Sequence, residues 1–256
     1  MTPAVRAADC CAQLRRLEHQ NSGELPIELH DQIETLQSTF DAVEIEMQES
    51  LSYSAESSDT YICPGWYRPI MNYRGSPLSV HFYSSVNDVA IWNTYRMARM
   101  KLHSTVFDQQ LHEPITTSAL KRTGMSRHET LQALIMKIST LIEDVCASVF
   151  YSFSHREDGL QPISSFEDIA GAKAYALITP LTIARDCLAR AELTDASPAR
   201  LDWINRVLKV MEERLGVSEA WCWEDGDEMA AKLEIERQLS FGRSTNYSST
   251  RVTGSN

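Results

Sequence analysis

The sequence predicts an all-α fold, a single helical-bundle domain with a long aromatic loop. Apolar residues recur at spacings of three and four over most of the chain up to about residue 239, which is typical of amphipathic helices. No segment shows a convincing strand alternation, and the nearest one, Leu78–Tyr83, is short. With 256 residues, 43% of them apolar, the chain is long enough to bury one sizeable core.

The N-terminal region, residues 1–60, is acidic and is expected to form helices. It holds 12 acidic residues and three arginines, so most of the net charge of −11 lies here. Residues 4–19 are predicted to form a short helix and residues 27–51 a longer one. The acidic residues fit either a solvated helix face or an acidic and hydrophobic docking surface, and the helical periodicity favours the first.

Residues 52–83 are predicted to form a long ordered loop, because prolines and glycines alternate there with aromatic residues. Further helices are expected over residues 85–111, 126–151, 165–191, 197–216 and 226–239. Ser126 and Glu129 have the spacing of a capping box at a helix start. Pro180 is expected to kink its helix, and Gly216 to end the next one.

These helices assign residues 61–241 to the helical domain, and residues 242–256 are expected to be a disordered tail. No stretch of about 18 apolar residues is present, so no membrane span is predicted. The N-terminus also lacks the apolar core of a signal sequence, and the chain is expected to be cytoplasmic or nuclear and not secreted. Its acidity argues against direct nucleic-acid binding.

The six cysteines fit neither zinc-ligand spacing nor a disulfide framework. Cys146 and Cys187 lie in apolar helical runs and are expected to be small buried residues. No phosphate-binding glycine loop, dinucleotide fingerprint or nucleophile motif is present, so no cofactor and no metal are predicted.

Four segments carry a distinctive order of motifs. They are Ile91–His103 (IWNTYRMARMKLH), Leu141–Val149 (LIEDVCASV), Ala170–Leu181 (AGAKAYALITPL) and Arg200–Leu208 (RLDWINRVL). Together they resemble the C-terminal helical regulatory domain of fungal zinc-cluster transcription factors, over about residues 63–223. The chain departs from that family at Phe150, where the resemblance leads us to expect proline, and its cysteine spacing does not fit the six-cysteine DNA-binding module.

The resemblance implies a domain that senses small effectors, restrains activation or mediates dimer and co-factor contacts. We therefore expect a small-molecule-binding or protein-interaction regulator of secondary-metabolite gene expression. Its partners would be a small ligand or biosynthetic intermediate, a transcription-factor partner or a second copy of the chain. The alternative is a cofactor-free enzyme of fungal secondary metabolism, a cyclase, isomerase, dehydratase or pericyclase, on the same fold.

A cationic and aromatic stripe is expected on one broad face of the helix over residues 85–111. Its members are Trp92, Arg96, Arg99 and His103. This stripe fits a pocket for a phenolic or carboxylate ligand, with Arg99 as anion clamp and His103 as acid or base. The structural alternative, which we favour, is that the arginines pair with carboxylates of the next helix and that His103 is packed and hydrogen-bonded.

Glu143 and Asp144 lie in an otherwise apolar helix, so one of them must face inward or lie at the edge of the core. A buried carboxylate with a raised pKa serves an acid–base isomerase or cyclase. It serves equally in a buried pair with arginine, which is slightly favoured.

The aromatic loop supplies the remaining candidates. His81 and Tyr83 are candidate acid and base groups if the protein is an enzyme. Trp66 and Tyr67 of the loop are candidate ligand-binding residues, as is Tyr151 at the end of the helix predicted over residues 126–151. The alternative is that these aromatic residues seal the side of the bundle without a ligand, and both interpretations stay open.

Overall fold

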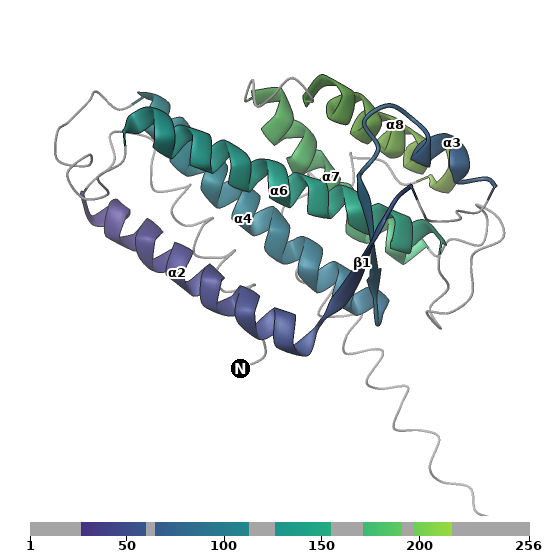
Figure 1. Cartoon of the computed structure of the whole chain (residues 1–256), viewed down its shortest axis with the longest axis horizontal. Helices are drawn as coiled ribbons and strands as arrows, with labels where there is room; N and C mark the ends of the chain where they lie inside the picture. Colours follow the sequence, from purple (N-terminus) through teal and green to yellow (C-terminus); the bar gives the residue numbers. More distant parts are fainter. Residues whose placement is uncertain (1–26, 60–64, 113–125, 155–170, 191–196, 217–256) are drawn as a thin grey trace, which may run out of the picture. The chain divides into compact units, whose positions relative to one another are not determined.

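The fold is seen in a computed structural model that describes residues 27–59, 65–112, 126–154, 171–190 and 197–216 (Figure 1). All of them belong to Met1–Val217, the first of the two units into which the chain divides. Within these residues the helices are α2 (Ile27–Ser50), α3 (Arg68–Met71), α4 (Val86–His112), α6 (Arg127–Ser154), α7 (Gly171–Arg190) and α8 (Ser197–Leu215). The predicted all-α class is confirmed.

A small antiparallel hairpin accompanies the helices. Strand β1 (Tyr53–Ser57) pairs with β2 (Ser79–Tyr83), with Tyr53 opposite Tyr83. The prediction of one long loop over residues 52–83 was therefore wrong in detail, because the hairpin and α3 lie within it. The strand β2 is the short alternation noted in the sequence, but its partner β1 is mostly polar and lies more than twenty residues away, so neither periodicity nor turn chemistry reveals the pair.

The helix ends follow the local signals in the sequence. At the start of α6, the Ser126 backbone N–H donates to a Glu129 carboxylate oxygen at 2.7 Å, and the Ser126 hydroxyl accepts from the Glu129 backbone N–H at 3.2 Å. This is the predicted capping box. At the end of α8, Gly216 takes a φ of +65° and donates its N–H to the Glu212 carbonyl at 3.2 Å, as predicted for a glycine C-cap.

Two further features of the helices concern proline. The helix α6 continues past Phe150 to Ser154, which agrees with the absence of proline at that position. The helix α7 continues through Pro180. The helices predicted over residues 4–19 and 226–239, the first residues of the one predicted over 165–191, and the tail over residues 242–256 lie outside the described residues.

The acidic segment uses its apolar side chains to build the core. The buried residues of α2 are Ile33, Leu36, Phe40, Val43 and Met47. They form one cluster with Trp92 and Tyr95 of α4 and with Tyr83 of the hairpin. Glu34, Asp41 and Glu49 are exposed, as a solvated helix face requires. Glu44 is half-buried instead, and it accepts a hydrogen bond from the Tyr95 hydroxyl at 2.7 Å.

The central helices of the fold are α4 and α6, which pack along each other, while α7 contacts both and α8 packs on α7. The strand β2 of the hairpin packs against α6 (Figure 1). None of the helices in the described ranges has an apolar stretch that would cross a lipid bilayer.

Candidate functional site

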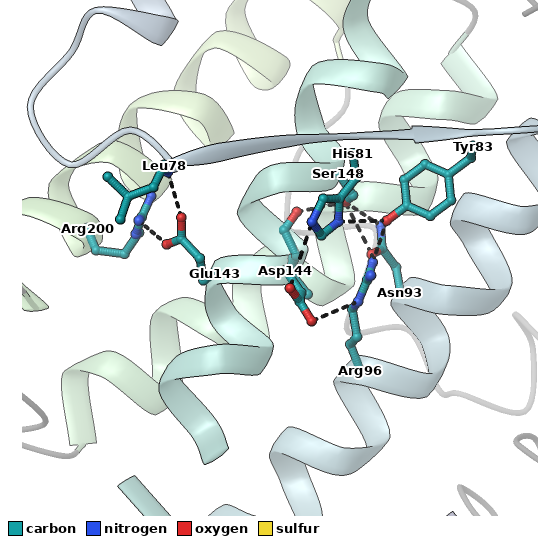
Figure 2. Close-up of polar contacts among 10 residues, drawn as sticks. Leu78, His81, Tyr83, Asn93, Arg96, Glu143, Asp144, Ser148 and Arg200 are labelled. Atoms are coloured by element: carbon teal, nitrogen blue, oxygen red, sulfur yellow. Dashed lines mark hydrogen bonds and ion pairs between the residues drawn. The ribbon is translucent and has the colours of Figure 1, made fainter. Parts of the chain in front are cut away.

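A polar cluster lies where the hairpin crosses α4 and α6, and we call it the Arg96 cluster. It consists of Tyr53, His81 and Tyr83 from the hairpin, Asn93 and Arg96 from α4, and Asp144 and Ser148 from α6. Figure 2 shows most of these side chains converging below the strand β2. The cluster is largely buried, since Arg96 is 1% and His81 3% exposed.

The guanidinium of Arg96 makes its short hydrogen bonds through Nη1, while Nε faces the Asp144 carboxylate at 3.8 Å. Its Nη1 donates to the Tyr83 hydroxyl at 2.7 Å and to the Asn93 carbonyl oxygen at 3.2 Å. Nε and Nη2 have no hydrogen-bond partner among the described residues. The guanidinium carbon lies 5.2 Å from the ring centres of both Tyr53 and Trp92, so the cation also contacts aromatic rings.

A chain of polar groups leads from Tyr83 toward solvent. The Tyr83 oxygen and His81 Nδ1 are 3.3 Å apart, and His81 Nε2 lies 3.9 Å from a carboxylate oxygen of Asp144. In the tautomer of neutral His81 that accepts the Tyr83 proton at Nδ1, the histidine proton lies on Nε2 and faces Asp144. The Asp144 side chain is 30% exposed.

The electrostatics leave one buried cation and two neutral groups at neutral pH. Burial, and then the charge of Arg96, lower the pKa of His81 to about 3. Burial raises the pKa of Tyr83 to about 12, although Arg96 opposes this effect. Burial also raises the pKa of Asp144 despite the nearby guanidinium. Asp144 is thus a weakly bound counterion of Arg96, because its oxygen lies 3.8 Å from Nε, beyond hydrogen-bond distance.

Glu143, the neighbour of Asp144 on α6, points in another direction and belongs to a second polar group (Figure 2). It accepts a hydrogen bond from the Leu78 backbone N–H at 2.7 Å and pairs with Arg200 of α8. Arg200 also donates to the Gly75 carbonyl at 2.6 Å.

The same region of α8 holds the segment before β2 through two more contacts. The Trp203 indole N–H donates to the Ile70 carbonyl at 3.0 Å, and the Tyr73 hydroxyl donates to Asp202 at 2.7 Å. We call this set of contacts between α8, Glu143 and residues 70–78 the α8 clasp.

The predicted stripe on α4 is divided between two faces. Trp92 and Arg96 contact the hairpin, whereas Arg99 pairs with Asp41 of α2 at 2.6 Å. The favoured expectation of arginine pairs with the next helix therefore holds for Arg96 and Asp144, but Arg99 pairs elsewhere. The reason is the rotation of about 300° over three helical residues. It places Arg99 about 60° around the helix from Arg96, on the side of α2.

His103 differs from its prediction as a hydrogen-bonded core histidine. It is 1% exposed, but neither ring nitrogen has a hydrogen-bond partner among the described residues. Burial, followed by the charge of Arg99, lowers its pKa to about 3, so it is neutral. It takes no part in the Arg96 cluster.

The aromatic candidates lie in two places. Tyr67 is fully buried, and its ring centre lies 5.3 Å from that of Phe150 and 5.5 Å from that of Trp66. Tyr151 lies nearer the Arg96 cluster, with its ring 5.6 Å from Tyr83. Tyr67 thus packs on the end of α6 rather than beside Arg96, and Trp66 packs on Tyr67. Whether these two residues seal the bundle or contact a ligand stays a prediction.

Three members of the cluster were missed at the level of sequence. Asn93 and Ser148 are 0% exposed, and the Asn93 amide donates to the Ser148 hydroxyl at 2.9 Å. Each lies one helical turn from a charged candidate, Asn93 before Arg96 and Ser148 after Asp144, and this spacing was a usable signal. Tyr53 had no such signal, because its position depends on the hairpin.

Cys146 and Cys187 are buried thiols outside any disulfide, as predicted. Burial raises the pKa of Cys146 to about 12, so its thiolate is not available as a nucleophile. Within the described ranges, no group of three or more His, Cys, Asp or Glu side chains is arranged to hold a metal ion.

No protein-family model, curated protein or solved structure matches this chain.

Proposed function

We propose that the protein is a regulatory helical domain that binds a small organic acid at the Arg96 cluster and relays its presence to gene expression. The observation that carries this proposal is the open edge of the buried Arg96 guanidinium, whose Nε and Nη2 have no acceptor among the described residues. A buried donor without an acceptor is costly, and a protein gains by filling it.

The shape of the open edge selects the ligand. Nε–H and the outer N–H of Nη2 point in parallel from one side of the planar group, which is the geometry that binds both oxygens of a carboxylate. Aromatic rings surround the guanidinium, since its carbon lies 5.2 Å from the Tyr53 and Trp92 ring centres and Tyr53 packs on His81. We therefore expect a carboxylate carried by an aromatic or otherwise flat molecule.

Asp144 occupies the approach to this edge, 3.8 Å from Nε. Since its pKa is raised by burial and its side chain is 30% exposed, the carboxylate can leave for solvent when a ligand carboxylate takes its place. Arg96 itself is 1% exposed, so the ligand enters as the hairpin moves away from α4 and α6. Binding and hairpin movement are then coupled, as a regulator requires.

The link to transcription rests on the resemblance of residues 63–223 to the regulatory domain of fungal zinc-cluster factors. We propose that the domain acts together with a partner chain or a second copy of itself, as the resemblance implies. Secondary-metabolite genes are the targets that the resemblance favours.

Benzoate, with benzamide as its uncharged counterpart, tests the binding site directly by isothermal titration. We expect benzoate to bind and benzamide to bind at least about tenfold more weakly, because a charge-assisted contact is worth about 1.5–3 kcal/mol. Arg96→Lys keeps the charge but loses the paired N–H groups, and we expect it to weaken benzoate binding by a similar factor. Equal binding of the two probes, or no binding of either, would contradict the proposal.

A second candidate function rests on the chain formed by Tyr83, His81 and Asp144. A neutral histidine between a buried phenol and a partly exposed carboxylate can move a proton, as a cofactor-free isomerase or cyclase requires. Deleting the gene separates the two functions. A regulator predicts that transcripts of pathway genes fall with the products, whereas an enzyme predicts unchanged transcripts and an accumulated intermediate.

A further inference from the structure

A second group of buried donors without hydrogen-bond partners lies further along α4, one and two helical turns beyond Arg96. Arg99 and His103 are one helical turn apart on the same face of the helix, and they are 8% and 1% exposed. Nε of Arg99 and both ring nitrogens of His103 have no hydrogen-bond partner among the described residues. Three buried polar atoms within one turn are thus left without the partners that buried groups normally have.

The charges around His103 come from three helices. Arg99 lies on α4, Lys137 on α6 and Asp41 on α2, and the two cations outweigh the carboxylate in their effect on the histidine. The single carboxylate is already engaged, because Asp41 pairs with Nη1 of Arg99 at 2.6 Å. The region between α2, α4 and α6 therefore offers donors and positive charge, and the described residues supply no acceptor for His103.

We propose that Arg99 and His103, with Lys137 nearby, form a binding site for a small oxyanion between α2, α4 and α6. The shared ligand chemistry is an anionic group with at least two oxygen acceptors, one for Nε–H of Arg99 and one for an N–H of His103. The Asp41 side chain is 65% exposed, so the site between the three helices meets solvent at the Arg99–Asp41 pair.

Charge balance makes this binding depend on pH. Arg99 is already neutralised by Asp41, so an incoming anion is balanced best when His103 takes up a proton. In the free protein the pKa of His103 is about 3, and the bound anion raises it. The affinity therefore increases as the pH falls, toward tenfold per pH unit where bound His103 is protonated and free His103 is not.

Two probes distinguish the source of the oxyanion. Sodium phosphate and sodium acetate are titrated into the full chain at constant ionic strength, with sodium chloride as the reference, while the ring nitrogen resonances of His103 are followed by NMR. We expect phosphate, acetate or both to move these resonances to the protonated position and chloride not to do so. A response to phosphate alone assigns the site to an inorganic oxyanion, and a response to acetate assigns it to organic carboxylates.

Matched variants test which side chains hold the anion. Arg99→Lys keeps the charge but removes Nε, and we expect it to weaken binding at least about tenfold. His103→Gln serves to assign the resonance and is expected to abolish the pH dependence. Arg214→Gln, which removes an exposed cation at the end of α8, is the control and is expected to change nothing. If either variant fails to fold, the His103 resonance of the unmodified chain still decides.

The proposal is overturned if the His103 resonances respond to neither phosphate nor acetate. It is also overturned if Arg99→Lys binds as the unmodified chain does, or if the affinity does not increase between pH 7.5 and pH 5.5. Because the readout belongs to His103, loss of benzoate binding at Arg96 would not affect this result, and the two proposals fail separately.

Discussion

Adjacent residues of α6 belong to two polar regions with opposite properties. In the α8 clasp, both carboxylate oxygens of Glu143 are engaged, one by the Leu78 N–H and one by Arg200, and Arg200 also reaches Gly75. In the Arg96 cluster, Asp144 makes no hydrogen bond within the described residues, and its nearest cation lies 3.8 Å away. One region is saturated with hydrogen bonds and the other is not.

This difference separates stability from binding. A saturated network fixes a structure, because moving any member leaves a charged group without a partner. An unsaturated one leaves buried donors in reach of a ligand, which then replaces the missing partner. The clasp thus anchors the segment before β2 to α8, while the hairpin beyond it covers a site that is ready to be filled.

The largest expected effect comes from the clasp, at Gly75. Its φ is +83°, and a Cβ at this position would lie 2.0 Å from the Ala199 carbonyl oxygen. For Gly75→Ala we expect a loss of about 2–5 kcal/mol in the free energy of unfolding, since the left-handed backbone costs about 1–2 and displacing α8 about 1–3. Urea denaturation measures it. Gly65→Ala is the control, because nothing lies within 4 Å of its Cβ, and an equal loss there would refute the account.

The next largest effect concerns the Arg96 cluster, where His81 makes the stability depend on pH. With a folded pKa of about 3 against 6.5 for the free side chain, unfolded His81 binds more protons throughout this range. Stability therefore falls as the pH falls from 6.5, by up to about 1.4 kcal/mol per pH unit. We expect His81→Gln to remove this part of the slope in urea unfolding at pH 6.5, 5.5 and 4.5.

His103, with a similar pKa, contributes a slope of its own that remains in His81→Gln. The exposed His128 provides the control, and His128→Gln is expected to keep the full slope. An unchanged slope in His81→Gln would show that His81 is protonated in the folded cluster.

A direct comparison of the two neighbouring carboxylates gives the smallest effects. Glu143→Gln should cost about 1–3 kcal/mol, because it removes the charge that Arg200 requires. Asp144→Asn should cost no stability at neutral pH and should increase it slightly, since the raised pKa of Asp144 means that folding disfavours its ionised form.

The same comparison has a pH signature. The wild-type chain should lose stability as the pH rises from 3.8, the ordinary pKa of an aspartate, through the raised folded value, and Asp144→Asn should lack this loss. Chemical denaturation of the two variants at matched pH checks both statements. Equal costs for both substitutions would contradict the distinction between the regions.

The sequence predicted where the long described helices lie, but it did not predict which of their side chains contact one another. The helix ends at Ser126 and Gly216 are set by local capping chemistry, which is visible in a few residues. Arg96 and Asp144 were found as candidates because charged residues stand out in apolar helices. That Arg99 and Glu143 lie outside this cluster was not predictable. It depends on which helix packs on which face of α4 and α6, and the tertiary structure decides this.

The hairpin shows the same limit more strongly. Tyr53 reaches Arg96 only because β1 pairs with a strand more than twenty residues later, and no local pattern in β1 indicates that pairing. His81 and Tyr83 were expected in a loop, yet their alternation along β2 is what places both over α4 and α6. Long-range strand pairing is therefore the step that brings the cluster together.

The most direct test of the central claim is the benzoate affinity of Asp144→Asn, measured by isothermal titration. If Asp144 only fills the approach to the open edge of Arg96, removing its charge should tighten benzoate binding by about tenfold, the equivalent of about 1.4 kcal/mol. Glu213→Gln removes an exposed carboxylate and should leave the affinity unchanged. Unchanged or weaker benzoate binding in Asp144→Asn would mean that Asp144 is the lasting partner of Arg96 and that the cluster is structural.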